Sequence, residues 1–308
     1  MNGAVTQKTR NAVEPTTAHS SRAEPATGGV DPAGRGLALL GDSILAASVR
    51  VPYRLYRGPN VCSHDASVPE ETPVALSFNG TTHAVMMATP SHLADFAVGF
   101  SLAEGIIESP ADIEDIGIVV HETGIELRMW LRGARASVFG ERQRRLAGPT
   151  GCGLCGIESL ADAVPPIRRV PDGITITPKL ISAALASIEP MQHLYQETRA
   201  VHAAGFFLPD GDLVSVREDI GRHNALDKLI GDLACRRISG ATGFVVLTSR
   251  ISIEMVHKTA TLGASIIVAM SAPSALALRA ARQAGMTLVA VARHDGFEVF
   301  TGAHRIGA

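Results

Sequence analysis

The sequence predicts a layered α/β protein in which a smaller, hairpin-rich lobe precedes the main sheet. Three short apolar segments, at 243–249, 265–271 and 287–293, alternate with helical segments. Continuous apolar strands between helices are typical of a partly parallel sheet that helices cover on both faces. Further upstream, apolar alternation on both sides of tight-turn dipeptides predicts antiparallel hairpins. The chain shows no internal repeat, so we expect two lobes rather than a repeat array.

Composition supports a globular protein and excludes several function classes. The chain has 308 residues, 46% of them hydrophobic, and a net charge of -2. This balance gives no basic field for nucleic acid or a membrane surface, so we expect neither as a partner. No apolar run reaches the roughly 18 residues of a membrane span, and the apolar stretch at 37–48 lacks the basic flank of a signal peptide. Four cysteines, of which two are close together, argue against a secreted disulfide scaffold, so we expect a cytoplasmic protein.

The chain divides into four predicted segments. Residues 1–35 are rich in Ala, Thr, Pro, Gly and Ser and hold almost no large apolar side chain, which is typical of disorder. The predicted boundaries are a disordered tail (1–48), a hairpin-rich N-terminal lobe (49–147), a mobile loop (148–157) and an α/β cofactor-binding lobe (158–308).

In the N-terminal lobe, residues 73–88 predict a hairpin that turns at Asn79-Gly80, a strong type I′ signal. A helix is expected over 91–105, with Ser91 as its N-cap and Gly105 at its end. Residues 116–131 predict a second hairpin.

The α/β lobe is predicted to alternate helices with the three apolar strands. A hairpin over 203–218 turns at Pro209-Asp210-Gly211. The expected helices cover 158–163, 178–188, 220–235, 252–263 and 273–284.

The segment GPTGCGLCGIESL (148–160) places Cys152 and Cys155 in a C-x-x-C motif with a glycine on either side of each. Such a loop can hold half a zinc site, cycle as a disulfide, carry sulfur as a persulfide, or be a plain turn. Glycine permits backbone conformations that expose both thiols. If a helix begins near Gly156, its N-terminal amides favour a thiolate.

A zinc site is not expected. The other two cysteines, Cys62 and Cys235, are isolated, and no suitably spaced histidine pair follows the motif. Zinc deaminases combine H-x-E with P-C-x-x-C, but here Ala204 stands two residues after His202 and the cysteines come first. A thioredoxin-type exchange remains open at this point.

Three polar segments lie at predicted helix starts. In 218–231, Asp219 is the expected helix cap, and the first turns are expected to present a solvated, salt-bridged face formed by Arg222, His223, Asn224, Asp227 and Lys228. In 249–260, Arg250 lies at a strand-to-helix junction, and Glu254 and Lys258 are spaced as an i,i+4 pair. In 270–278, Ser271 precedes Pro273 at an expected helix start.

Because parallel strands end at one edge of a sheet, Arg250, Ser271 and Arg293 are expected to converge there. Two guanidinium groups beside helix starts suit a diphosphate. We therefore expect a nucleotide or anion site at this edge.

Taken in order, five segments resemble the FdhD/NarQ family of formate dehydrogenase accessory sulfur carriers. The segments are VALSFNG, FAVGFSLAEGIIESP, LAGPTGCGLCGIESL, EDIGRHNALDKLIG and SRISIEMVHKTA, within a match over about residues 50 to 305. The resemblance implies a cytidine-deaminase-like fold without metal chemistry. It also implies a sulfurtransferase that accepts sulfur from a cysteine desulfurase and passes it to the molybdenum or tungsten bis-guanine-dinucleotide cofactor, Mo-bis(molybdopterin guanine dinucleotide), of formate dehydrogenase.

The resemblance also implies site residues. Cys152 corresponds to the persulfide carrier and Cys155 to the second thiol. The cofactor-binding stretch of the family aligns with Val291, Ala292, Arg293, His294, Asp295 and Gly296. The chain departs from the family at Asp295-Gly296, where relatives often have Gly-Arg, and Arg293 is expected to supply the charge.

The expected partners are a cysteine desulfurase, a formate dehydrogenase catalytic subunit and a second copy of the chain in a homodimer. Two alternatives stay open. A cofactor-binding chaperone would bind the dinucleotide without moving sulfur, whereas a dithiol oxidoreductase would cycle a Cys152–Cys155 disulfide and have no affinity for nucleotide.

Overall fold

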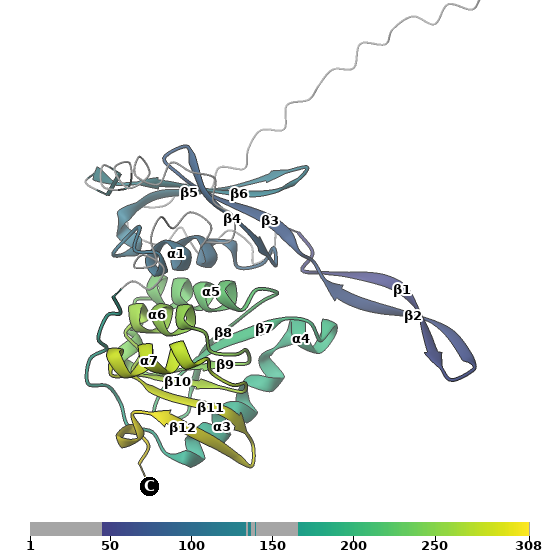
Figure 1. Cartoon of the computed structure of the whole chain (residues 1–308). Coiled ribbons are helices and arrows are strands. Elements are labelled where there is room, and N and C mark those ends of the chain that lie inside the picture. The colour runs from purple at the N-terminus through teal and green to yellow at the C-terminus, as the bar shows by residue number, and fades with distance from the viewer. Residues whose placement is uncertain (1–44, 134, 137–138, 140–165, 308) are drawn as a thin grey trace, which may run out of the picture.

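A computed structural model describes residues 45–133, 135–136, 139 and 166–307. These residues form a two-stranded ribbon, a four-stranded sheet and a six-stranded sheet. The two larger sheets lie in separate layers with helices between them, and the ribbon extends away from both (Figure 1). This is the predicted α/β class with a smaller, hairpin-rich N-terminal part. None of the helices within the described residues combines the length and the apolar composition that a membrane span requires.

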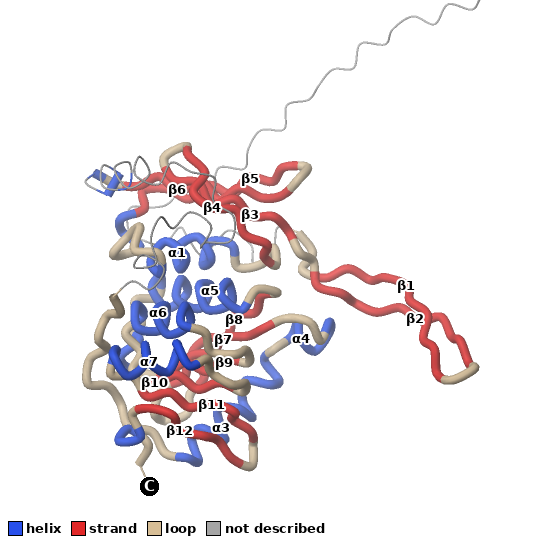
Figure 2. Tube along the Cα trace, in the orientation of Figure 1, coloured by secondary structure: helices blue, strands red, loops and turns tan. Residues whose placement is uncertain are grey.

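The projecting ribbon consists of β1 (Ser48–Arg57) and β2 (Asn60–Pro69), which pair in antiparallel register (Figure 2). It is a hairpin that the sequence analysis did not predict. Residues directly opposite each other share a face, so one face carries Val49 with Val68, Val51 with Ala66, Tyr53 with His64, and Leu55 with Cys62. At the base of the ribbon, the Ser48 hydroxyl donates to Glu197 Oε1 at 2.7 Å, which joins it to α4 (His193–Thr198).

The four-stranded sheet has the order β4-β3-β6-β5, and its two hairpins are the predicted ones. Its strands are β3 (Thr72–Phe78), β4 (Thr81–Ala88), β5 (Ile113–His121) and β6 (Gly124–Leu131). Asn79 and Gly80 have φ values of 50° and 81°, as the type I′ turn requires. Helix α1 (Leu93–Ala103) packs on the apolar face of this sheet. The expected cap was wrong, because His92, in a left-handed conformation, is the N-cap instead of Ser91.

The six-stranded sheet has the order β12-β11-β10-β9-β7-β8. Its strands are β7 (His202–Phe207), β8 (Leu213–Asp219), β9 (Phe244–Leu247), β10 (Ile266–Ala269), β11 (Thr287–Arg293) and β12 (Gly296–Thr301). Strands β9, β10 and β11 are parallel, and β7 and β12 are antiparallel to their neighbours β9 and β11. The predicted partly parallel sheet is confirmed, whereas β12 was not predicted.

Helices cover both faces of this sheet, as predicted. Helices α5 (Arg222–Cys235), α6 (Ile253–Leu262) and α7 (Ala275–Ala284) pack on one face, and α3 (Pro178–Ile188) packs on the other. Ser274, not Ser271, caps α7, because its hydroxyl accepts from the Ala277 N–H at 3.2 Å. The predicted helix at 158–163 lies outside the described residues. Short 3₁₀ turns occur at Pro110–Asp112, Glu189–Met191, Gly240–Thr242 and Ala303–Arg305.

Helices α1 and α5 join the two layers through direct backbone contact. They lie against each other between the sheets (Figure 1). A Cβ atom built on Gly99 of α1 would lie 1.7 Å from the Asp227 carbonyl oxygen of α5, and one on Gly231 of α5 would lie 1.9 Å from the Asp95 carbonyl oxygen of α1. The helices can approach this closely because both positions lack a side chain.

We expect Gly99→Ala to destabilise the protein by about 2 kcal/mol or more, because the methyl group collides with backbone that cannot move aside. The same change in an unconstrained helix stabilises by up to about 1 kcal/mol, so the sign of the effect is informative. Urea unfolding measures it. Gly117→Ala in β5, where the nearest atom to the added Cβ is 3.8 Å away, is the control and should change stability little. A Gly99→Ala protein at least as stable as the wild type would contradict the contact.

Candidate functional site

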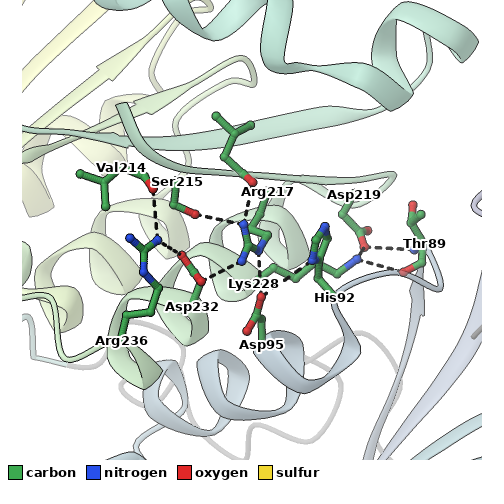
Figure 3. A network of polar contacts seen from close by, with 11 residues as sticks. Thr89, His92, Asp95, Val214, Ser215, Arg217, Asp219, Lys228, Asp232 and Arg236 are labelled. Carbon is green, nitrogen blue, oxygen red and sulfur yellow. Dashed lines mark hydrogen bonds and ion pairs between the residues drawn. The ribbon is translucent and has the colours of Figure 1, made fainter. Parts of the chain in front are cut away.

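A buried ion pair anchors the first turns of α5 (Figure 3). Lys228 Nζ lies 2.6 Å from Asp219 Oδ2, and both side chains are fully buried. Lys228 also donates to the Thr89 carbonyl at 2.9 Å, and Asp219 accepts from the Thr89 N–H, the Gly221 N–H and Asn224 Nδ2. Two sequence expectations were therefore wrong here. Asp219 is a buried counter-ion and Gly221 is the N-cap, while Asn224, Asp227 and Lys228 are buried instead of solvated.

A second buried pair joins α5 to α6. Lys258 Nζ donates to both carboxylate oxygens of Asp227, at 2.7 and 2.9 Å, and lies 3.6 Å from Glu104. Burial raises the pKa of Asp227 to about 6, against the opposing effect of Lys258. Burial opposes protonation of Lys258, but the carboxylates of Asp227 and Glu104 outweigh it and raise the pKa of that ammonium. The expected Glu254–Lys258 pair is not formed, because Lys258 turns inward.

Arginine side chains continue this network along α5. Arg217 on β8 lies between two carboxylates, with its Nε 2.8 Å from Asp95 Oδ2 of α1 and its Nη2 2.8 Å from Asp232 Oδ1 of α5 (Figure 3). Arg236 Nη1 lies 3.1 Å from the other oxygen of Asp232, Oδ2. Charged groups from α1, α6 and β8 thus contact α5 along its length, and the first residues of α5 lie at one edge of the six-stranded sheet.

The carboxyl ends of β10 and β11 bring two of the predicted site residues together at that edge. The Val291 N–H donates to the Ser271 carbonyl at 3.2 Å. Arg293, at the end of β11, donates through Nη1 to the carbonyls of Met270 and Ala292. Val291 has a φ of 52°, and the β11–β12 register shifts between Ala290 and Arg293.

The predicted stretch 291–296 is therefore an irregular hairpin. It contains the end of β11, a turn at His294 and Asp295, and the first residue of β12, Gly296. Apart from Ala292, which is buried, its residues are exposed.

Arg250 follows β9 and is exposed. The next residue, Ile251, accepts from the Ser274 N–H and donates to the Ala272 carbonyl, so Arg250 lies near the segment that follows Ser271. His202 begins β7, which is hydrogen-bonded to the end of β9 through Ala203 and Thr248. Burial lowers the pKa of His202, and the positive charges of Arg222 and Arg250 lower it further, against Asp219. The edge thus holds Ser271 with Arg293 at β10 and β11, and Arg250 with Arg222 and His202 at β9 and β7.

His223, in the first turn of α5, is held neutral. Burial lowers its pKa to about 4, with the charges of Arg222 and Lys258 acting in the same direction and those of Glu254 and Glu104 against it. Its Nε2 lies 4.0 Å from Glu254 Oε2.

Among the cysteines, the predicted carriers Cys152 and Cys155 lie outside the described residues. Cys62 is exposed on the ribbon, and Cys235 is largely buried at the end of α5. Burial, aided by Asp95 and Asp232, raises the pKa of the Cys235 thiol to about 12, so this thiol is a poor nucleophile near neutral pH. In the parts of the chain that the structure describes, no group of three or more His, Cys, Asp or Glu could hold a metal ion.

Comparison with known proteins gives consistent matches over most of the chain. A model of the FdhD/NarQ family matches residues 69–307. The chain belongs to the FdhD/NarQ family. Among its relatives is the sulfur carrier protein FdhD of Agrobacterium fabrum, which is 48% identical over 268 residues, covering 86% of this chain and 98% of that protein. The corresponding protein of Brucella abortus is 49% identical over 240 residues, covering 78% of this chain and 89% of that protein.

A solved member of similar fold is the crystal structure of a putative formate dehydrogenase accessory protein from Desulfotalea psychrophila. It aligns with a TM-score of 0.67 and 26% identity, covering 85% of this chain and all of that one. This confirms the FdhD/NarQ fold, whereas the likeness to cytidine deaminases stays a prediction.

The sequence analysis missed how the polar residues of α5 are divided. Asp227 and Lys228 of α5 pack inside together with Asp219 at the end of β8, whereas Arg222 and His223 lie at the edge. The spacing of these polar residues in the sequence does not show which of them are buried. Helix α5 is enclosed by the sheet on one side and by α1 on the other, so polar residues on both sides of it become buried. The glycines that admit α1, Gly99 and Gly231, were the available clue.

We expect the His223→Gln variant to lose less stability than the wild type when the pH is lowered. The pKa of His223 is lower in the folded protein than its ordinary value of 6.5, so the unfolded chain binds more protons between pH 6.5 and about 4. The wild type therefore loses stability as the pH falls from 6.5 to about 4. Above pH 6.5, His223 is neutral in both the folded and the unfolded chain and does not change the stability. Melting temperatures between pH 7 and 4.5 should fall less steeply in the variant, while His304→Gln, at an exposed position, should follow the wild type. Parallel curves for all three proteins would show that His223 is not held neutral.

Proposed function

We propose that this protein is a sulfur carrier that accepts persulfide sulfur from a cysteine desulfurase on Cys152 and delivers it to the cofactor of formate dehydrogenase. The observation that carries the proposal is the family match, which spans 69–307 and so includes the C-x-x-C motif. Relatives that are nearly half identical over almost their whole length are named sulfur carrier protein FdhD.

The proposed transfer is a thiol–persulfide exchange. The Cys152 thiolate attacks the outer sulfur of a cysteine persulfide on the donor. A sulfur–sulfur bond forms on Cys152 while the donor's bond breaks, and the donor cysteine leaves as a thiolate. One sulfur–sulfur bond replaces another, so no external oxidant or reductant is needed. Cys155, three residues away, is placed by the sequence to receive or release the same sulfur.

The other cysteines fit this role poorly. Cys235 is protonated near neutral pH, since burial raises its pKa to about 12. Cys62 lies on the ribbon among exposed side chains, away from the six-stranded sheet (Figure 1).

The cargo in this proposal is the guanine-dinucleotide cofactor, whose phosphates suit the edge at Ser271 and Arg293. Arg293 is exposed and uses Nη1 for its two carbonyl contacts, and no other hydrogen bond of its guanidinium occurs among the described residues. Its remaining N–H groups can donate to phosphate oxygens, which guanidinium groups bind well. Arg293 and the 291–296 hairpin are the residues we assign to this contact.

We expect Cys152→Ala to abolish maturation of active formate dehydrogenase, because the variant has no thiol to carry the sulfur. The measurement is formate dehydrogenase activity in cells that contain only the variant, together with intact mass after incubation with a cysteine desulfurase and cysteine. The wild type should gain the mass of one or more sulfur atoms and the variant should not. Cys62→Ala and Cys235→Ala are matched controls and should retain activity. Full activity with Cys152→Ala would refute the carrier role, and sulfur-free maturation would favour a cofactor chaperone.

We expect GDP, which represents part of the cofactor, to bind more tightly than ADP and to protect 291–296 from hydrogen exchange. Arg293→Ala should weaken GDP binding about tenfold, the size typical of a lost charge-assisted hydrogen bond. Persulfide loading of Cys152 should be unaffected, because it requires only the loop and the donor. Calorimetry measures the affinities. Equal GDP affinity in the wild type and in Arg293→Ala would refute the assignment of the nucleotide to Arg293 and the 291–296 hairpin, but it would not bear on the role of the protein as a sulfur carrier.

A further inference from the structure

The cations around α5 fall into two groups. Arg217, Lys228, Arg236 and Lys258 each lie within 4.0 Å of a carboxylate. Arg222 and Arg250, at the edge of the sheet, form no ion pair among the residues that the structure describes. A buried N–H group without an acceptor raises the free energy of the folded state, so the Nε of Arg222, which is buried and has no partner among the described residues, points to an acceptor from outside them.

Arg222 and Arg250 both lie close enough to His202 for their charges to influence it. Arg222 is the first residue of α5, Arg250 follows β9, and the charges of both lower the pKa of His202 at the start of β7. Backbone contacts bring these three segments together. His202 lies opposite Asp219, whose carboxylate accepts from the Gly221 N–H next to Arg222, and the Ala203 N–H donates to the hydroxyl of Thr248, two residues before Arg250.

The cluster also has hydrogen-bonding capacity that the described residues do not use. The Nε of Arg222 and the Nε2 of His223 are both inaccessible to solvent and have no hydrogen-bond partner there. Glu254 is the nearest carboxylate to His223 and is 4.0 Å from Nε2, beyond hydrogen-bonding distance. In addition, the N-cap of α5 is Gly221, which supplies no side chain to the free N–H groups of the first turn.

We propose that Arg222 and Arg250, with His202 and His223 beside them, bind a phosphate or diphosphate group at the β7–β9 side of the sheet edge. Arginine is suited to this role because its fixed fork of N–H groups matches two phosphate oxygens. The start of a fourteen-residue helix adds a favourable dipole, since its amide groups carry partial positive charge. This anion site depends on neither Arg293 nor persulfide chemistry, although a phosphate of the proposed cargo is one source of the anion.

Two of the nearby carboxylates are bonded to lysines inside the protein and not to the two arginines. Asp219, which faces His202, is neutralised by Lys228 at 2.6 Å, and Lys258, which faces His223, is paired with Asp227 and lies near Glu104. Glu254 remains as the acid that faces both His223 and Arg222. The formal charges of the named groups cancel, because four cations (Lys228, Lys258, Arg222 and Arg250) stand against four carboxylates (Asp219, Asp227, Glu104 and Glu254). The proposal therefore depends on the unused N–H groups of the arginines, which form no ion pair among the described residues, and not on net charge.

Inorganic pyrophosphate is the probe, titrated by calorimetry into the full-length protein at low salt. We expect Arg222→Gln and Arg250→Gln each to weaken binding about tenfold or more, as expected for a lost charge-assisted contact. Arg236→Gln is the matched control, because Arg236 is exposed next to the other end of α5, and it should bind like the wild type. Arg250 is exposed, so its variant should keep the fold even if Arg222→Gln does not.

A second readout follows the histidines. A bound anion should raise the pKa values of His202 and His223, which NMR measures from the pH dependence of their ring signals. Pyrophosphate should increase both pKa values in the wild type and increase them much less in Arg250→Gln. Competition with GDP distinguishes the sources of the anion. If the site holds the phosphates of a nucleotide, then pyrophosphate displaces GDP; if it holds a separate anion, then GDP affinity is unchanged by pyrophosphate.

Lack of pyrophosphate binding by the wild type, or equal binding by the wild type and both arginine variants, would overturn the proposal. If Arg293→Ala loses GDP binding but still binds pyrophosphate, the proposed anion site at Arg222 and Arg250 is supported. The anion site and the nucleotide placement can therefore fail independently.

Discussion

The contact between α1 and α5 sets the arrangement of the whole molecule. Gly99 and Gly231 let the two backbones touch, so that α1, which carries the four-stranded sheet, and α5, which packs on the six-stranded sheet, share one interface. Such an approach leaves no space for a side chain at either glycine. Thr89, which precedes α1, binds both members of the Asp219–Lys228 pair, and Asp95 within α1 binds Arg217. The two layers are thus joined by polar contacts of defined geometry as well as by apolar packing.

Burial of these charges has a cost that depends on complete pairing. A carboxylate or ammonium removed from water is tolerated when its partner and its remaining hydrogen bonds are present, and losing one partner destabilises strongly. Asp219 satisfies this condition, because it accepts from one ammonium, two backbone N–H groups and one side-chain amide. The pairs therefore favour one relative position of α1 and α5 over its neighbours. Since α5 begins at the edge of the sheet, its first residues, Arg222 and His223, are held in place by the same contacts.

The sequence predicted the parts of the fold that local pattern determines. Asn79-Gly80 specifies a two-residue turn whatever surrounds it, and the apolar runs at β9, β10 and β11 can be buried only in a covered sheet. The ribbon was missed although Val49, Val51, Tyr53 and Leu55 alternate with polar residues or proline. Three arginines and one proline interrupt the hydrophobic signal there, and no partner face was evident. Strand β12 was missed because its pairing with β11 begins at an irregular hairpin rather than at a recognisable turn.

The candidate site shows a different limit of sequence reasoning. Ser271 and Arg293 could be placed together because parallel strands end at one edge, a rule that needs no side-chain detail. Pairing could not be predicted in the same way: Lys258 is four residues from Glu254 but turns toward Asp227, which lies 31 positions earlier in the chain. Which cations remain without a partner is therefore a property of the folded protein. Because Asp219 and Asp227 are committed to Lys228 and Lys258, Arg222 and Arg250 at the edge are left to an anion from outside the described chain.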